Sequence, residues 1–331
     1  MKRALVVAAG VVTAALVVGG TLLFSPLLDP DLSAHPEPLT SYPEASARIQ
    51  AVLDAEAAMD LIPAGHSIAL LTGARTENVV VLFHGFTSAP AQFRLIAQAY
   101  RDQGYNVWVP RLPYHGQTNR LTDDPSKLTA ESLRDFADDA IDVAAGLGDH
   151  ITVVGLSAGG SLALWSAVAR PEVTRAVLIS PLLLPLGYQE WQQPVIVRAL
   201  RLSPVDSYAW WDPALKDGGP HQYNYSRYSL KGMAALLGLN HWAASAPSVS
   251  RASVVLVRND ADPLLDPDYD ESFLTRLVSA DRLTVVRIPA SEGLGHDLVC
   301  PDPLGENYAN INTAYRYLEQ ALGIPLPAPR A

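Results

Sequence analysis

One serine stands in a context that could make it a nucleophile. Residues 151–161 read ITVVGLSAGGS, so a β-branched run enters a G-x-S-x-G pattern centred on Ser157 and continues into an alanine- and leucine-rich stretch. A turn this tight from strand to helix needs small residues beside the serine, and it leaves the serine strained with its hydroxyl exposed. Gly155 and Gly159 meet that need. The pattern predicts attack by Ser157 on an electrophilic carbon.

A serine hydroxyl is a weak nucleophile at neutral pH and needs a base, for which histidine has a suitable pKa. Chains built around such a turn place the nucleophile first, then an acid, then the base. The histidines that follow Ser157 are His221, His241 and His296. His221 and His241 precede the candidate acids, whereas His296 lies in the loop GLGHD after the last expected strand. We therefore expect His296 to be the base.

The acid that orients the base should lie just beyond the strand in residues 253–263, SVVLVRNDADP. Asp260 and Asp262 compete for this role. The acid usually comes a few residues past the last apolar strand residue, which favours Asp262 and leaves Asp260 to cap the turn. Asp266 and Asp268 are further along, where they are expected to cap the next helix.

Attack on a carbonyl builds negative charge on its oxygen, and this charge needs preorganised hydrogen-bond donors. Residues 79–89, VVVLFHGFTSA, predict a strand that ends at His84-Gly85-Phe86. We expect the backbone amides of Phe86 and Ala158 to form this oxyanion hole, with Gly85 permitting close approach. His84 is interpreted as a packed or solvated residue that shapes the loop, because the backbone supplies the donor.

The elements that must position these residues alternate between β-branched runs and helical patterns, which is typical of βαβ units in a mostly parallel sheet. Amphipathic stretches at 91–103 and 130–147 are expected to be crossover helices. The expected strands are 79–83, 106–109, 151–154, 176–179, 253–257 and 283–288.

One interval, at about 182–251, is far longer than an ordinary connection and should be an inserted structure. Two interpretations stand: a small helical subdomain with its own core, or an aromatic wall around an acyl or aryl pocket. Its aromatic residues are Trp191, Trp210, Trp211, Trp242, Tyr188, Tyr208, Tyr223, Tyr225 and Tyr228.

The N-terminal segment carries a separate signal. Lys2 and Arg3 precede an uncharged apolar stretch at 4–26, long enough as a helix to cross a bilayer. Asp29 and Asp31 follow it, which places the N-terminus in the cytoplasm and the rest of the chain outside. The alternative is a secretory signal peptide cleaved near Leu32-Ser33-Ala34, giving a secreted protein.

This division gives an anchor or signal segment at 1–28, a proline-rich linker at 29–42 and a folded domain at 43–331. Apolar residues make up 49% of the 331-residue chain, so a substantial core is expected.

A formal net charge of −10 argues against nucleic-acid binding. The single cysteine, Cys300, gives neither a disulfide nor metal-site spacing, and we expect no metal and no cofactor. No protein partner is indicated.

Together these motifs resemble bacterial α/β-hydrolases of the carboxylesterase and monoacylglycerol-lipase type, from about Val79 to Leu322. The matching features are His84-Gly85-Phe86, Arg111 with Tyr114-His115-Gly116, the GLSAGG turn, Asn259 to Asp262 and Gly295-His296. The resemblance implies an α/β-hydrolase fold, with a mostly parallel sheet flanked by helices and an inserted helical lid. It also implies a structural role for His115-Gly116. The insertion is larger than a minimal esterase lid, so the family's substrate preferences do not carry over.

Several reactions remain open. Haloalkane dehalogenases and epoxide hydrolases are excluded, because they need an aspartate at position 157. Hydrolysis of a carboxylic ester through an acyl-enzyme on Ser157 is the leading hypothesis, with an apolar small-molecule acyl ester as the substrate and its chain length left open. The same residues would serve an amidase, an aminopeptidase or an acyltransferase, although the acidic groups an aminopeptidase needs are few in the insertion. A non-catalytic surface scaffold is the remaining alternative, and loss of a triad residue would be its mark.

Overall fold

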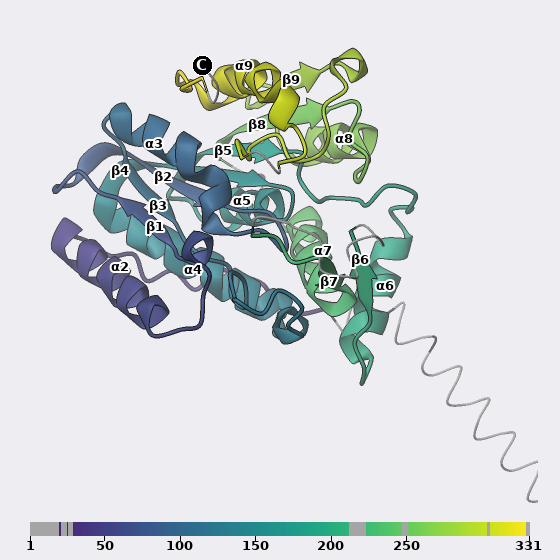
Figure 1. Cartoon of the computed structure of the whole chain (residues 1–331). Coiled ribbons are helices and arrows are strands. Elements are labelled where there is room, and N and C mark those ends of the chain that lie inside the picture. The colour runs from purple at the N-terminus through teal and green to yellow at the C-terminus, as the bar shows by residue number, and fades with distance from the viewer. Residues whose placement is uncertain are drawn as a thin grey trace, which may run out of the picture.

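A seven-stranded sheet forms the centre of the molecule (Figure 1). The computed structural model describes residues 29–211, 223–246, 251–302 and 305–328, together with Gly20 and Ser25. The strand order is β1-β3-β2-β4-β5-β8-β9, with β1 antiparallel to β3 and the other pairs parallel. The strands are β1 (Ile68–Leu70), β2 (Thr76–Phe83), β3 (Asn106–Val109), β4 (Gly148–Leu156), β5 (Val173–Ile179), β8 (Ser253–Asn259) and β9 (Leu283–Ile288). All six expected strands are confirmed.

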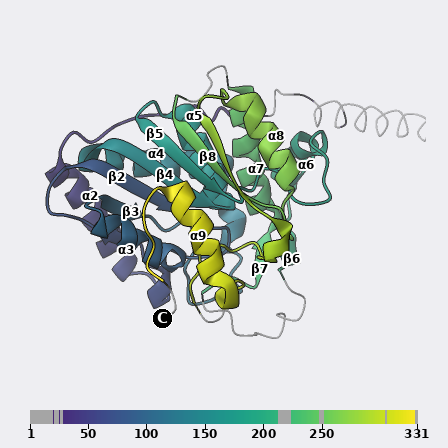
Figure 2. The ribbon, with the colours of Figure 1, turned by 90° about the horizontal axis from the view of Figure 1, so that it is seen from above.

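Helices cover both faces of the sheet, as Figure 2 shows from above. Alternate residues of β2 belong to two separate cores: Val79 and Val81 pack on one side, Val80 and Leu82 on the other. Burial on both faces explains why the strands read as continuous apolar runs. The first core includes α2 (Tyr42–Ala57), α4 (Ala130–Leu147), α5 (Ala158–Ala169) and α8 (Pro267–Leu277), and the second includes α3 (Arg94–Asp102) and α9 (Ile311–Leu322).

Two helices were expected from the apolar periodicity, and both are present. The helix expected at 130–147 has the predicted bounds, and a capping box between Thr129 and Ser132 fixes its start. The stretch expected at 91–103 is a 3₁₀ turn over Pro90–Phe93 followed by α3. Proline at the first helical position is compatible with such a tight opening turn.

The insertion between β5 and β8 contains α6 (Gln192–Leu202), β6 (Tyr208–Trp210), β7 (Arg227–Ser229) and α7 (Leu230–Ser245). The antiparallel β6–β7 pair was not expected from the sequence. The rings of Trp165 on α5 and Trp242 on α7 lie 6.3 Å apart and join the insertion to the main core.

The proline-rich stretch expected to be a linker lies against the domain. Residues 29–40 form no helix or strand, in keeping with their composition. However, Leu32 is fully buried, and its carbonyl accepts a hydrogen bond of 2.9 Å from the Trp165 indole. The backbone N–H of His35 donates to Asp138 on α4. Residues from Asp29 onward, where Asp29 pairs with Arg198 on α6, therefore already pack against the domain, ahead of the boundary expected near Pro43.

The membrane span expected at 4–26 lies outside the described residues, apart from Gly20 and Ser25. Among the helices that the structure describes, none combines the length and the apolar character needed to cross a bilayer.

Candidate active site

Ser157 occupies the sharp turn between β4 and α5, at the carboxyl end of the central strand. Its backbone has φ +56° and ψ −116°, a conformation that non-glycine residues rarely adopt. A Cβ atom on Gly155 would collide with the backbone of Gly159, and one on Gly159 would collide with the carbonyl of Phe83. The strained turn and the two flanking glycines are as the sequence predicts.

His296 and Asp262 meet in a buried hydrogen bond. The His296 Nδ1 atom lies 2.7 Å from Asp262 Oδ2, and both side chains are almost fully buried. The other carboxylate oxygen of Asp262 accepts the backbone N–H groups of Leu264 and Leu265, which fixes the carboxylate toward the ring. The two partners come from loops that follow β8 and β9.

Asp260, the competing acid, points elsewhere. Its carboxylate forms ion pairs with Arg258 at 2.6 Å and with Arg287 at 3.3 Å. Asp266 caps α8 by accepting the N–H groups of Asp268 and Tyr269. The geometry therefore separates the two candidates: Asp262 contacts the histidine, and Asp260 belongs to a cluster of charges near the surface.

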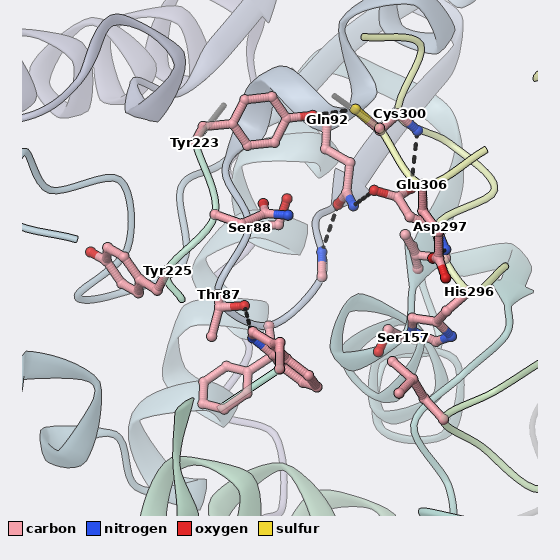
Figure 3. A pocket seen from close by; sticks show the side chains of 17 residues that line it. Thr87, Ser88, Gln92, Ser157, Tyr223, Tyr225, His296, Asp297, Cys300 and Glu306 are labelled. Carbon is pink, nitrogen blue, oxygen red and sulfur yellow. Dashed lines mark hydrogen bonds between the residues drawn. The ribbon is translucent and has the colours of Figure 1, made fainter. Parts of the chain in front are cut away.

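Ser157 and His296 face one cavity of about 460 Å³ (Figure 3). Among the described residues, no hydrogen bond joins the Ser157 hydroxyl to the His296 ring. Such bonds are often long without substrate and shorten when it binds. The cavity thus brings together the predicted nucleophile and base, with Asp262 behind the base.

The expected oxyanion donors also face this cavity region. Phe86 lines the cavity, and Ala158 is the first residue of α5, whose N–H has no acceptor within the helix. In the described part of the chain, neither amide donates to a protein group. The positive end of the α5 dipole favours a negatively charged group at this end of the helix.

Two buried histidines hold the loop that carries Phe86. His84 Nε2 accepts the Leu112 N–H, so its Nδ1 carries the proton and donates to the Gly85 carbonyl. His115 likewise accepts the Thr87 N–H through Nε2, at 3.0 Å. Burial lowers the pKa of His84 well below its ordinary value and that of His115 to about 4, so both rings stay neutral. These contacts agree with the loop-shaping role expected for His84 and with the structural role that the resemblance implies for His115, and they show that both rings are buried.

The cavity wall includes three aromatic residues of the insertion, Trp211, Tyr223 and Tyr225. The Trp211 indole donates to Thr87, which ties the insertion to the oxyanion loop. The Tyr223 hydroxyl contacts Cys300, and burial raises the pKa of that thiol to about 12, so it stays protonated. Both interpretations of the insertion therefore have support, since α7 packs in the core while these aromatics form a wall.

Gln92 is a component of the site that sequence reasoning missed. This buried side chain accepts the Gly85 N–H through its oxygen and donates to Asp297 through its nitrogen, each at 2.9 Å (Figure 3). It therefore joins the loop of the expected oxyanion donor to the residue next to His296. Its position inside an amphipathic helical pattern gave no sign of this role.

Replacing Gln92 with alanine should lower kcat about 10- to 100-fold with a smaller effect on KM, because small misplacements of reacting groups are costly. Steady-state kinetics and a thermal melt would test this. Gln98→Ala is the matched control, since Gln98 contacts only Asp102 on the exposed side of α3. A Gln92→Ala enzyme with the wild-type kcat would show that the link does not position the loops.

The comparison with known families decides the assignment. A model of the alpha/beta hydrolase family matches residues 80–306, which is more than half of the chain. The chain belongs to the alpha/beta hydrolase family. The matched region includes the strained serine turn, the buried His296–Asp262 pair and the loop of Phe86.

Within this family, the chain is 36% identical over 107 residues to a thermostable monoacylglycerol lipase of Bacillus sp. (strain H-257). The aligned region covers 30% of this chain and 39% of that relative. The chain thus shares a limited part of its sequence with this relative.

Solved structures support the same fold. A structure from work on LipS and LipT, two metagenome-derived lipolytic enzymes, superposes with a TM-score of 0.59 at 18% identity, covering 80% of this chain and 99% of that one. A soluble variant of the Saccharomyces cerevisiae monoglyceride lipase gives 0.55 at 16% identity, covering 75% and 87%. The Paleococcus ferrophilus monoacylglycerol lipase gives 0.54 at 19% identity, covering 77% and 98%.

Proposed function

We propose that the protein hydrolyses carboxylic esters through an acyl-enzyme on Ser157. The buried hydrogen bond between His296 and Asp262, in loops beside the cavity that holds Ser157, is the observation that carries this proposal. A buried carboxylate on Nδ1 leaves Nε2 free to accept a proton. The same arrangement fits other acyl transfers, and the apolar wall and the lipase relative favour an ester.

In this mechanism the Ser157 oxygen attacks the acyl carbon while His296 Nε2 takes its proton. The negative oxygen of the tetrahedral intermediate accepts hydrogen bonds from the Phe86 and Ala158 amides. His296 then gives the proton to the departing alcohol. Water, activated by the same imidazole, attacks the acyl-enzyme and releases the acid, which restores Ser157.

An apolar acyl group, of the kind carried by a lipid ester, fits the features of the cavity. Phe86, Leu264 and Trp211 supply apolar surface beside Ser157. The partial relative is named a monoacylglycerol lipase, which agrees with such a substrate.

The proposal is tested by hydrolysis of p-nitrophenyl esters from acetate to palmitate, with the full chain in detergent. Turnover that depends on Ser157 would support an esterase. The acyl chain length of the preferred ester would indicate the size of the acyl-binding site. Labelling by a fluorophosphonate probe without ester turnover would favour an amidase or an acyltransferase. Absence of both would favour a non-catalytic scaffold.

The pH profile should follow His296. Burial disfavours its charged form, but the carboxylates of Asp262, Glu306 and Asp297 outweigh burial and raise the pKa of His296 above its ordinary value. Because the base must be neutral, kcat/KM should be high above this raised pKa and fall as the pH drops through it.

Glu306→Gln is expected to move that acidic limb to lower pH, since it removes one negative charge and keeps an acceptor for the Asp297 amide. Rates measured over roughly pH 5 to 9 would define the limb. A midpoint that does not move would contradict the assigned influence of Glu306.

We further propose a membrane-anchored protein, with residues 4–26 as the span and the hydrolase domain outside the cytoplasm. The basic residues ahead of the apolar stretch support this orientation. Cleavage after Ala34 would remove buried Leu32 and its contact with Trp165, so the packing of this segment favours the retained anchor over the secreted form.

A further inference from the structure

Helix α6 and the residues at its two ends carry several exposed apolar side chains. Trp191, Val195, Ala199 and Leu202 recur at spacings of four, four and three residues, so they share one side of the helix. Trp191 and Leu202 are 66% and 58% exposed, and Val205, just past the helix end, is 68% exposed. We call these five residues the α6 stripe. Large apolar side chains that gather in the open on one part of a protein surface mark an interaction site.

The stripe continues toward the mouth of the cavity. Leu264 lines the cavity and is itself partly exposed. Its carbonyl accepts the N–H of Leu186 at 2.8 Å, and Leu186 and Tyr188 are exposed on the loop that leads into Trp191. Exposed apolar side chains therefore occur from the cavity to the loop ahead of Trp191, interrupted by Gln189 and Glu190, and α6 lies at the outer edge of the insertion in Figure 1.

The segment that follows the apolar stretch 4–26 is held on the same helix. Asp29 accepts two hydrogen bonds from the Arg198 guanidinium, at 2.8 and 2.6 Å, and lies 3.4 Å from His241 on α7. Arg198 precedes Leu202 by one helical turn, so both lie on the same side of α6. The chain therefore passes from the expected span to the domain beside the α6 stripe.

We propose that the α6 stripe rests on the surface of the bilayer in which residues 4–26 are anchored. The occupant is a zwitterionic phospholipid surface, because the nearby cations Arg201 and Arg276 are paired with Glu131 and Glu190 and leave little basic excess for anionic lipid. Trp191 is suited to the headgroup level, where tryptophan is enriched.

An ester dissolved in the bilayer would then reach Ser157 by passing Leu186 and Leu264. The inference rests on the proposed localisation, and its last step also rests on the proposed function.

The first test is quenching of tryptophan fluorescence by brominated phosphatidylcholine, with the full chain reconstituted in vesicles. The stretch 4–26 contains no tryptophan, so any quenching comes from the domain. Trp191→Phe should remove most of the quenchable signal. The matched control, Trp242→Phe, should leave it unchanged, because Trp242 packs against Trp165. Equal quenching in wild type and Trp191→Phe would overturn the proposal, as would complete shielding of Trp191 by a second copy or by the apolar stretch itself.

A second test separates docking from chemistry. Leu202→Ser with Val205→Ser should lower hydrolysis of a vesicle-embedded long-chain ester at least several-fold and leave hydrolysis of soluble p-nitrophenyl acetate unchanged. If the wild type and the double variant hydrolysed the vesicle-embedded ester at equal rates, the proposed entry of substrate from the bilayer would be wrong. If the wild type cleaves neither ester, the proposed function fails, whereas the quenching result still decides whether the stripe contacts lipid.

Discussion

The Ser157→Ala enzyme should lose ester hydrolysis by on the order of a million-fold in kcat while keeping the wild-type fold. The expectation follows from the role of the hydroxyl, since no acyl-enzyme forms without it. Alanine keeps the Cβ atom that the strained turn already accommodates at φ +56°. Little change in the free energy of unfolding is therefore expected.

The measurement pairs kcat on a p-nitrophenyl ester with fluorophosphonate labelling and a thermal melt. Ser166→Ala is the matched control, because Ser166 lies on the same helix and its hydroxyl donates to the Leu162 carbonyl one turn earlier. Ser157→Ala should show neither labelling nor turnover, and Ser166→Ala should show both. A Ser157→Ala enzyme that retains a few per cent of the rate would remove Ser157 from the role of nucleophile.

The fold was predictable from the sequence wherever the burial of a strand or helix produces a recognisable run or periodicity of apolar residues. Strands buried on both faces, such as β2 and β4, read as continuous β-branched runs and were found at the expected places. The strands β1, β6 and β7 have three residues each, too few for any periodicity to appear. Their positions depend on pairing with neighbours that only the folded chain brings together.

The packing of residues 29–40 also depends on distant partners. Proline content correctly predicted the absence of helix and strand there. It gave no indication that the buried carboxylates of Asp138 and Asp142 on α4 accept the backbone N–H groups of His35 and Glu37. The same carboxylates pair with Arg170, so one buried ionic cluster fixes both the helix and the preceding segment.

The residues of the candidate site also differ in whether a local sequence pattern reveals them. Ser157, His296 and Asp262 were predicted because each lies at the end of a recognisable strand and because their order along the chain is constrained. Gln92 was missed because one of its two partners is Asp297, 205 residues away. A glutamine on an amphipathic helix has no local feature that reports such a contact.

Asp262→Asn should lower kcat roughly ten-thousand-fold. An asparagine at this position either turns its amide nitrogen toward His296 Nδ1 or lacks the charge that stabilises the imidazolium. In both cases the ring loses the tautomer and orientation that leave Nε2 free for the Ser157 proton. Removing the Asp262 charge also removes the main influence that raises the pKa of His296.

The residual activity of Asp262→Asn should therefore have its acidic limb at lower pH than the wild type, measured as kcat/KM against pH. Asp260→Asn is the matched control, since that carboxylate pairs with Arg258 and Arg287 and makes no contact with His296. It should keep kcat within about a few-fold of the wild type, because Arg258 retains its ion pairs with Asp268 and Glu271. If Asp260→Asn were instead the more damaging change, the buried 2.7 Å contact of Asp262 would be structural, and the acid of the triad would have to be reassigned.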